Sequence, residues 1–144
     1  MKKIILSMIS IMTKIFLIGC FNEPTISKDT DVKDLVPTEV DDLDFIEYQE
    51  SDYPFGEPLD QITGMYKTNT GINISISICK FDSADEASTE AEELIESYEE
   101  MEVVRIGAKY IVFSQDSFMF FVFGFPESTQ QQVESVAKAT GYYP

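Results

Sequence analysis

The clearest pattern along the chain is a strict alternation of isoleucine with small, mostly polar residues over residues 72–79. A period of two places all four isoleucines on one face of a β-strand. The turn-forming sequence Asn69-Thr70-Gly71 comes just before this strand, and residues 61–67 precede the turn as a second strand candidate. The two segments together predict an antiparallel hairpin.

A helical period follows the hairpin. Ser83 and Glu86 have the spacing of a capping box, which predicts a helix that begins at Ala84. Glutamates crowd the outer side of this helix up to Glu102, and its apolar residues recur on one stripe. The stripe consists of Ala84, Ala87, Ala91, Leu94, Ile95, Tyr98 and Met101.

A second helix is predicted over residues 127–140, with Gly141 as its C-terminal stop. Its inward residues are Val133, Val136, Ala137 and Thr140. Further strand candidates are residues 44–49, 103–106, 109–114 and 117–125. This order of strands and helices predicts an α+β fold, a two-layer sandwich in which an antiparallel sheet carries two helices on one face.

The strand candidate at 117–125 is apolar on both faces, which is typical of a central strand buried on both sides. If both helices cover one side of the sheet, part of this aromatic row must face something else. One interpretation is that the N-terminal segment with Phe45, Tyr53 and Phe55 folds over it. The other is an exposed patch that binds a protein partner, a second copy or an apolar ligand. The candidate patch residues are Phe118, Met119, Phe121, Phe123 and Phe125.

The chain begins with Met1-Lys2-Lys3, and a mostly apolar run follows over residues 4–18. A short basic region before such a run is typical of a secretory signal peptide. The segment Leu17-Ile18-Gly19-Cys20 then resembles the lipobox of prokaryotic lipoproteins. The resemblance implies that the Cys20 thiol receives a diacylglycerol and that the chain is cut just before it. Lys14 departs from the pattern, because a charge at the centre of a membrane helix costs roughly 2.5–3.5 kcal/mol.

Two other interpretations of the apolar run stay open. The first is an uncleaved N-terminal anchor, although about 15 residues are short for a hydrocarbon core of about 30 Å. The second is a buried helix of the fold. Cleavage and anchoring both place the rest of the chain outside the cytoplasm, at the cell membrane or envelope. Under cleavage, residues 1–19 are the signal peptide, residues 20–42 are a lipidated cysteine with a flexible acidic tether, and residues 43–144 are the globular domain.

The net charge of −16 excludes a nucleic-acid surface, because phosphate binding needs clustered lysine and arginine. Residues 1–19 contain three lysines and no acid, so the remaining 125 residues carry a net charge of −19. Attraction to anionic lipids therefore does not hold this chain on a membrane, and the acyl chains must do so. Asp29-Thr30-Asp31 begins like a calcium loop, but Asp34 and Val40 stand where glycine and glutamate are required.

The candidates for chemistry are few. The chain has no histidine, no glycine-rich phosphate loop and no paired-cysteine metal motif, and it points to no cofactor. Cys79 is expected to be a small buried residue, and Arg105, the single arginine, is expected to pair with a neighbouring acid. Asn73 begins an N-glycosylation sequon just after the hairpin turn and on its polar face.

The layout resembles that of small uncharacterised envelope lipoproteins of prokaryotes, archaeal ones included, and this resemblance transfers no active residues. The sequence therefore favours a lipid-anchored envelope protein whose acidic domain is a non-enzymatic module for a protein partner, a second copy or a ligand. The alternative is an envelope enzyme that uses carboxylates with a divalent cation. A purely structural role at the cell surface is a third hypothesis.

Overall fold

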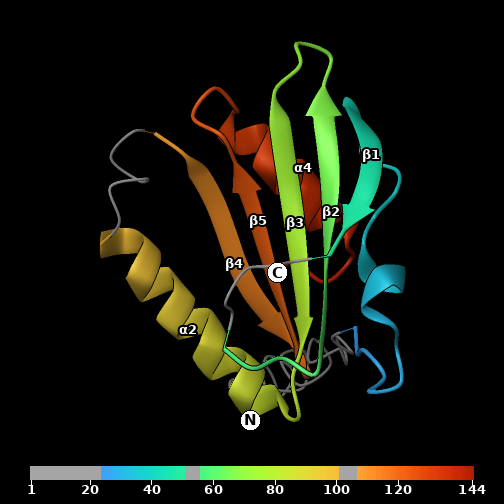
Figure 1. Ribbon diagram of the computed structural model, residues 1–144, viewed down its shortest axis with the longest axis vertical. Coiled ribbons are helices and arrows are strands. Elements are labelled where there is room, and N and C mark those ends of the chain that lie inside the picture. The colour runs from blue at the N-terminus through green and yellow to red at the C-terminus, as the bar shows by residue number, and fades with distance from the viewer. Residues whose placement is uncertain (1–23, 51–55, 101–106) are drawn as a thin grey trace, which may run out of the picture.

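A five-stranded antiparallel sheet with the order β1-β2-β3-β5-β4 organises the chain. The computed structural model describes residues 24–50, 56–100 and 107–144 (Figure 1). Strand β5 lies between β3 and β4, so the hairpin β4–β5 joins the meander β1–β2–β3 through its second strand. The elements are η1 (Val32–Leu35), β1 (Leu43–Gln49), β2 (Asp60–Thr68), β3 (Asn73–Lys80), α2 (Ala84–Glu100), β4 (Lys109–Gln115), β5 (Phe118–Gly124) and α4 (Gln130–Ala139).

The fold belongs to the α+β class, as the sequence predicts, and β2 and β3 form the predicted hairpin. The four isoleucines predicted to share one face include Ile74, Ile76 and Ile78, which are completely buried in one core cluster. The strand expected at 103–106 lies outside the described residues. The other five predicted strands match β1 to β5 within one or two residues at each end.

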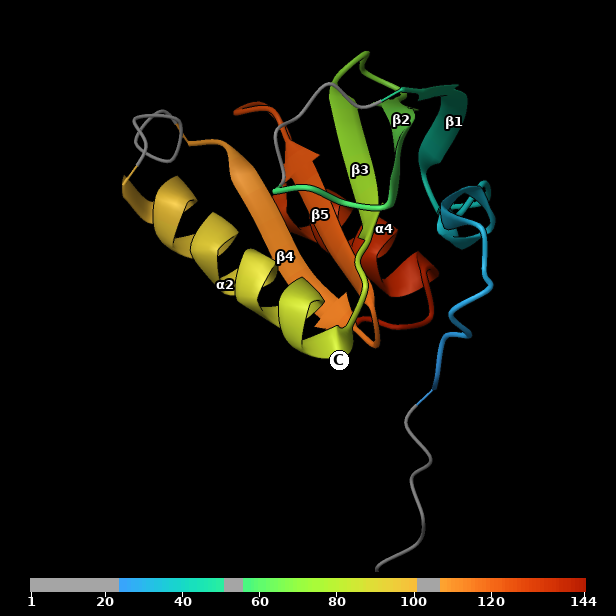
Figure 2. The ribbon, with the colours of Figure 1, turned by 60° about the horizontal axis from the view of Figure 1, so that its bottom comes forward.

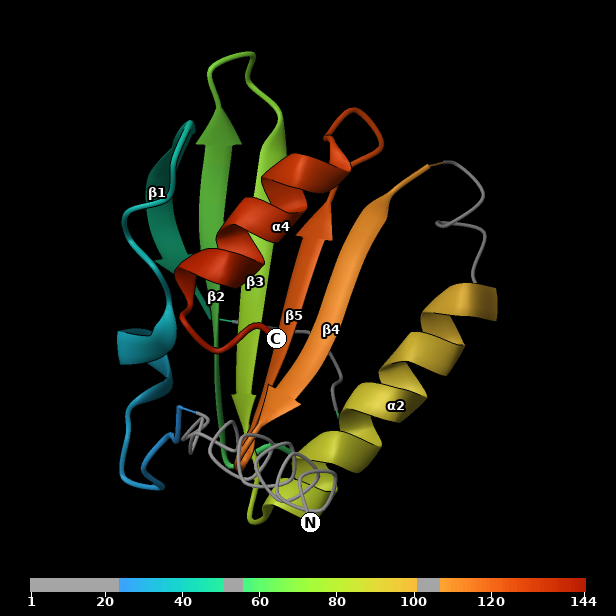
Figure 3. The same cartoon turned by 180° about the vertical axis from the view of Figure 1, so that it is seen from behind.

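The two helices cover opposite faces of the sheet, so the prediction of both helices on one face is wrong. Residues of α4 pack in one cluster with Ile74, Phe120 and other side chains of that face. Residues of α2 pack in a second cluster with Met119 and Phe121, which point the other way from β5. Figure 2 shows α2 in front of the sheet and α4 behind it, and Figure 3 shows α4 from its own side. The physical reason is β5 itself, since a strand that is apolar on both faces needs cover on both.

The segment before β1 belongs to the core, so the predicted flexible tether over residues 20–42 is wrong for the described part, from residue 24. Four apolar side chains of this segment are buried in the α4-side cluster: Ile26, Val32, Leu35 and Val36. A single turn of 3-10 helix, η1, begins where the Asp31 carboxylate accepts the backbone N–H of Lys33 at 2.8 Å. Val36 lies so close to Gly64 of β2 that a Cβ at that glycine would come within 2.5 Å of it.

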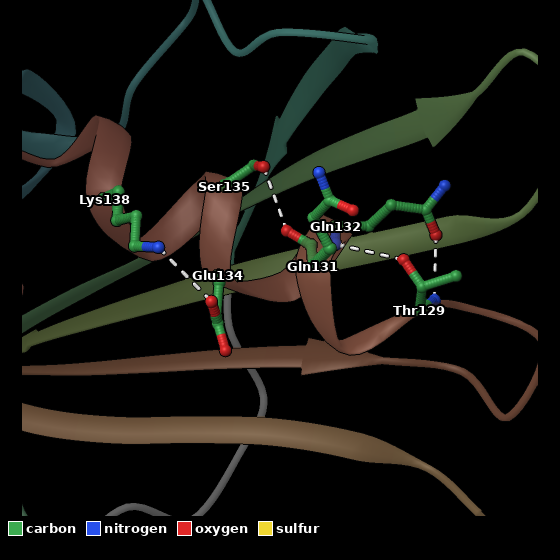
Figure 4. A network of polar contacts seen from close by, with 6 residues as sticks. All are labelled: Thr129, Gln131, Gln132, Glu134, Ser135 and Lys138. Atoms are coloured by element: carbon green, nitrogen blue, oxygen red, sulfur yellow. Dashed lines mark hydrogen bonds and ion pairs between the residues drawn. The ribbon is translucent and has the colours of Figure 1, made fainter.

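Helix α4 begins later than predicted, at Gln130 instead of residue 127. Thr129 is its N-cap and forms a full capping box with Gln132, a pattern that the sequence analysis missed (Figure 4). Its inward residues Val133, Val136 and Ala137 are fully buried, as predicted. The helix ends as predicted before Gly141, which has a left-handed φ of 79°.

Helix α2 begins as predicted at Ala84, because the Ser83 hydroxyl accepts the backbone N–H of Glu86 at 3.1 Å. The Glu86 carboxylate accepts the N–H of Asp82 instead of completing the box at Ser83. The helix carries eight acidic residues and no basic residue. Among the described residues, no helix is both long and apolar enough to cross a membrane.

Candidate functional site

The aromatic row of β5 is core rather than surface. Phe118, Met119 and Phe121 are buried, so the predicted exposed patch is wrong at these three positions. Phe123 is half-buried, and Phe125 is the one member that is exposed, at 46% of its surface.

Helix α2 covers the Phe121 side of the sheet. The Tyr98 ring lies 5.0 Å from the ring of Phe121 and 5.3 Å from that of Tyr110, centroid to centroid. Phe45, which was expected over this row, lies on the opposite face and makes an edge contact with Tyr66. Tyr53 and Phe55 lie outside the described residues. The row therefore gives the domain its two-sided core and leaves little apolar surface for a ligand.

Cys79 is fully buried at the end of β3, as predicted. Burial, together with the nearby Glu90 carboxylate, raises the pKa of its thiol to about 12. A thiol with such a pKa stays protonated at neutral pH, and the thiolate is the reactive form. The position therefore does not suit a catalytic cysteine.

Glu90 of α2 has a raised pKa, and it lies half-buried against the segment before β2. Partial burial raises this pKa most, and the carboxylates of Glu93 and Glu86 raise it further. The Glu90 carboxylate packs on Gly56, where an added Cβ would come within 2.6 Å of it. Gly56 also has a left-handed φ of 58°, so both the space and the backbone favour glycine there.

Two shallow hollows border the loop that leads into β1. One, of about 630 Å³, is lined by residues 38–41 and 43–45. The other, of about 350 Å³, lies between Glu39–Asp41 and the end of α4 at Ser135, Lys138 and Ala139. Acidic residues line both, with Lys138 as the one basic lining residue. Within the described ranges, no group of three or more cysteine or acidic side chains is placed to hold a metal ion.

The start of the described chain is fixed to the turn between β4 and β5. The Asp116 carboxylate accepts the backbone N–H of Ile26 at 2.6 Å. The Gln115 side-chain amide donates to the carbonyl of Pro24 at 2.9 Å. Asp116 adopts a left-handed φ of 50°, a conformation that aspartate and asparagine tolerate better than most residues. The sequence analysis missed this attachment, because no local pattern links residues about 90 positions apart.

The remaining predicted sites have separate outcomes. Asn73 is exposed at the first position of β3, so the sequon asparagine is accessible and its glycosylation stays a prediction. Cys20 and Arg105 lie outside the described residues. The calcium-like sequence at Asp29 instead forms a local turn and the cap of η1.

No family model, no curated protein and no solved structure matches this chain.

Proposed function

We propose that this protein is a lipid-anchored component of the cell envelope whose acidic domain serves as a non-enzymatic binding module on the extracytoplasmic side. The lipobox Leu17-Ile18-Gly19-Cys20 after a basic start and an apolar run is the observation that carries the proposal. Cys20 is the residue that receives the lipid, and the domain follows it closely in the sequence.

The charge of the exposed surface supports a binding module over an enzyme. Helix α2 presents eight carboxylates without a compensating base on the same helix. The hollows beside residues 38–45 add Glu39, Asp41 and Asp44. A surface of this kind favours partners that carry positive charge, because complementary potentials speed association and exclude like-charged proteins. The buried, high-pKa Cys79 thiol does not favour covalent catalysis.

Mass spectrometry of the protein isolated from membranes tests the anchor. The expected N-terminal peptide begins at Cys20 and carries the mass of a diacylglycerol. A Cys20→Ser variant is expected to lose this modification, and a variant that remained fully processed and membrane-bound would overturn the proposal. Cys79→Ala is the matched control, since it removes the other cysteine and keeps the acylated peptide. Membrane-bound protein with an unmodified Cys20 would overturn the proposal.

A further inference from the structure

We propose that the end of the sheet that carries the β4–β5 turn is the surface that this domain holds against the lipid headgroups. The proposal rests on the proposed acylation of Cys20. It gives the domain one orientation, with the β4–β5 turn toward the membrane and the β2–β3 turn away from it.

The described chain starts at this end of the sheet. Pro24 and Ile26 are tied to Gln115 and Asp116 by the two hydrogen bonds already described. The Ile26 side chain is buried in the core, so side-chain packing holds the segment in addition to the hydrogen bonds of its backbone. The chain therefore emerges from a defined point beside the turn.

The remaining connection to Cys20 is short. Residues 21–23 alone separate it from Pro24, and an extended chain of this length spans at most about 14 Å between the two Cα atoms. A flexible tether up to residue 42 would instead have a root-mean-square length of about 25 Å and would allow any orientation. An acylated Cys20 lies at the bilayer surface, so the turn end is kept within reach of the headgroups.

The same end carries the most exposed leucine of the described residues. Leu59 is 61% exposed, and its backbone N–H donates to the carbonyl of Lys80 at 2.8 Å. Lys80 is paired with Phe118, the first residue of β5, and its ammonium lies 5.8 Å from the centre of that ring. An apolar side chain next to a lysine with an apolar stem suits the boundary between acyl chains and headgroups.

The exposed acids at this end include Asp60, Asp82 and Asp85, the last in the first turn of α2, and they limit the strength of the contact. They oppose anionic headgroups, so this surface would not hold the domain on a membrane without the anchor. The lipid anchor keeps the domain close to the bilayer, so the effective concentration of headgroups at this surface is high. Leu59 then adds a local apolar contact. The lipid surface that fits is therefore zwitterionic or weakly charged.

The opposite end of the sheet points away from the membrane in this arrangement (Figure 1). Strands β2 and β3 pair from Asp60 and Lys80 at the membrane end to Lys67 and Asn73 at the far end. Eight residues of β3 span about 25 Å. The β2–β3 turn and the sequon at Asn73 therefore lie outermost.

Energy transfer to the membrane surface tests the orientation. The full chain, purified from membranes, carries one donor dye on Leu59→Cys or on Asn69→Cys in the exposed β2–β3 turn, in phosphatidylcholine vesicles with an acceptor on the headgroups. The buried Cys79 stays unlabelled at pH 7, and an acylated Cys20 has no free thiol. We expect at least twofold more transfer from position 59 than from position 69. Equal transfer, or more from position 69, would overturn the proposal.

A second variant tests the attachment itself. Gln115→Ala combined with Asp116→Gly removes both hydrogen bonds to the N-terminal segment and keeps a residue that tolerates a left-handed φ at position 116. The ratio of transfer between positions 59 and 69 is expected to fall, and the buried Ile26 side chain limits the size of the fall. An unchanged ratio would show that the attachment does not set the orientation.

Dye found on Cys20 would mean that acylation, and with it the proposed function, has failed. The orientation is still measurable in that case, because the free Cys20 can be coupled to a maleimide lipid and the two positions compared again. The two proposals therefore fail separately.

Discussion

The Asp116 carboxylate accepts the backbone N–H of Ile26 at 2.6 Å, and the two residues lie 90 positions apart in the sequence. This bond joins the start of the described chain to the last turn of the sheet. The segment between Ile26 and Val36 is consequently part of the α4-side core, which a tether would not be.

Replacing Ile26 tests whether this segment belongs to the fold. Ile26→Ala is expected to lower the free energy of unfolding by about 2–4 kcal/mol, because it removes buried methyl groups and leaves a cavity. Denaturation in urea measures the change. Ile46→Ala is the matched control, since Ile46 is 53% exposed in β1, and it should cost less than about 0.5 kcal/mol. If both substitutions had equally small effects, the segment would be a tether and not part of the core.

Replacing Asp116 isolates the hydrogen bond. Asp116→Gly removes the carboxylate and relieves the left-handed φ of 50°, and Asp42→Gly relieves a similar φ of 62° at a residue before β1. Because a charged hydrogen bond contributes about 1.5–3 kcal/mol, we expect Asp116→Gly to be about 1.5 kcal/mol less stable than Asp42→Gly. Amide hydrogen exchange at Ile26 should also accelerate in the first variant and not in the second. Retained protection at Ile26 would contradict the role of Asp116.

Two phenylalanines of the same aromatic row are expected to respond differently to serine. Phe121→Ser should cost at least about 3 kcal/mol or prevent folding, because the ring is buried beneath α2 and contacts Tyr98. Phe125→Ser should cost less than about 1 kcal/mol, because that ring is 46% exposed. Thermal melts followed by circular dichroism compare the two. A folded Phe121→Ser protein of unchanged stability would show that the ring is not core.

Glu90 is expected to make stability depend on pH. Its pKa in the folded protein is raised above the ordinary value of 4.5, mainly by burial and then by Glu93 and Glu86. The protonated form is therefore favoured by folding, and this contribution is present at low pH and lost as the pH rises through the raised pKa. Glu90→Gln should add about 0.5 kcal/mol at pH 7, because it removes a partly buried charge and its repulsion from Glu93 and Glu86, and it should add little near pH 4.

Glu96→Gln is the control for this experiment, since Glu96 is exposed on α2. It also removes one negative charge but does not lie against Gly56. Unfolding free energies of both variants at pH 4, 5, 6 and 7 make the comparison. An identical pH profile for the two variants would contradict the role given to the position of Glu90.

The local patterns of the sequence predict most of the sheet and both helices. Alternation identifies β3, because Ile74, Ile76 and Ile78 fill one face, and the Ser83 cap identifies the start of α2. These features depend on residues close together in the chain, so a single sequence carries them. The Thr129 cap of α4 has the same local character, but the predicted start at residue 127 lies before it.

The errors concern contacts between distant residues. Nothing in residues 26–36 predicts that Val36 will lie against Gly64, and their polar composition favours a tether instead. The order of elements favours one covered face, and the sequence did not predict that a helix on each face would cover the two apolar faces of β5. Among the predicted site residues, the burial of Cys79 is confirmed and the exposure of most of the aromatic patch is not.

The position of β5 in the sheet has a consequence for when this protein can fold. Strand β3 pairs with β5, whose last residue is Gly124, while α2 and β4 come between them in the sequence. A chain that is synthesised or threaded through a pore from its N-terminus therefore cannot close its sheet until β5 has emerged. Until then the edge of β3 that pairs with β5 has no partner. Because this pairing joins residues far apart in the sequence, we expect it to be the slow step of folding.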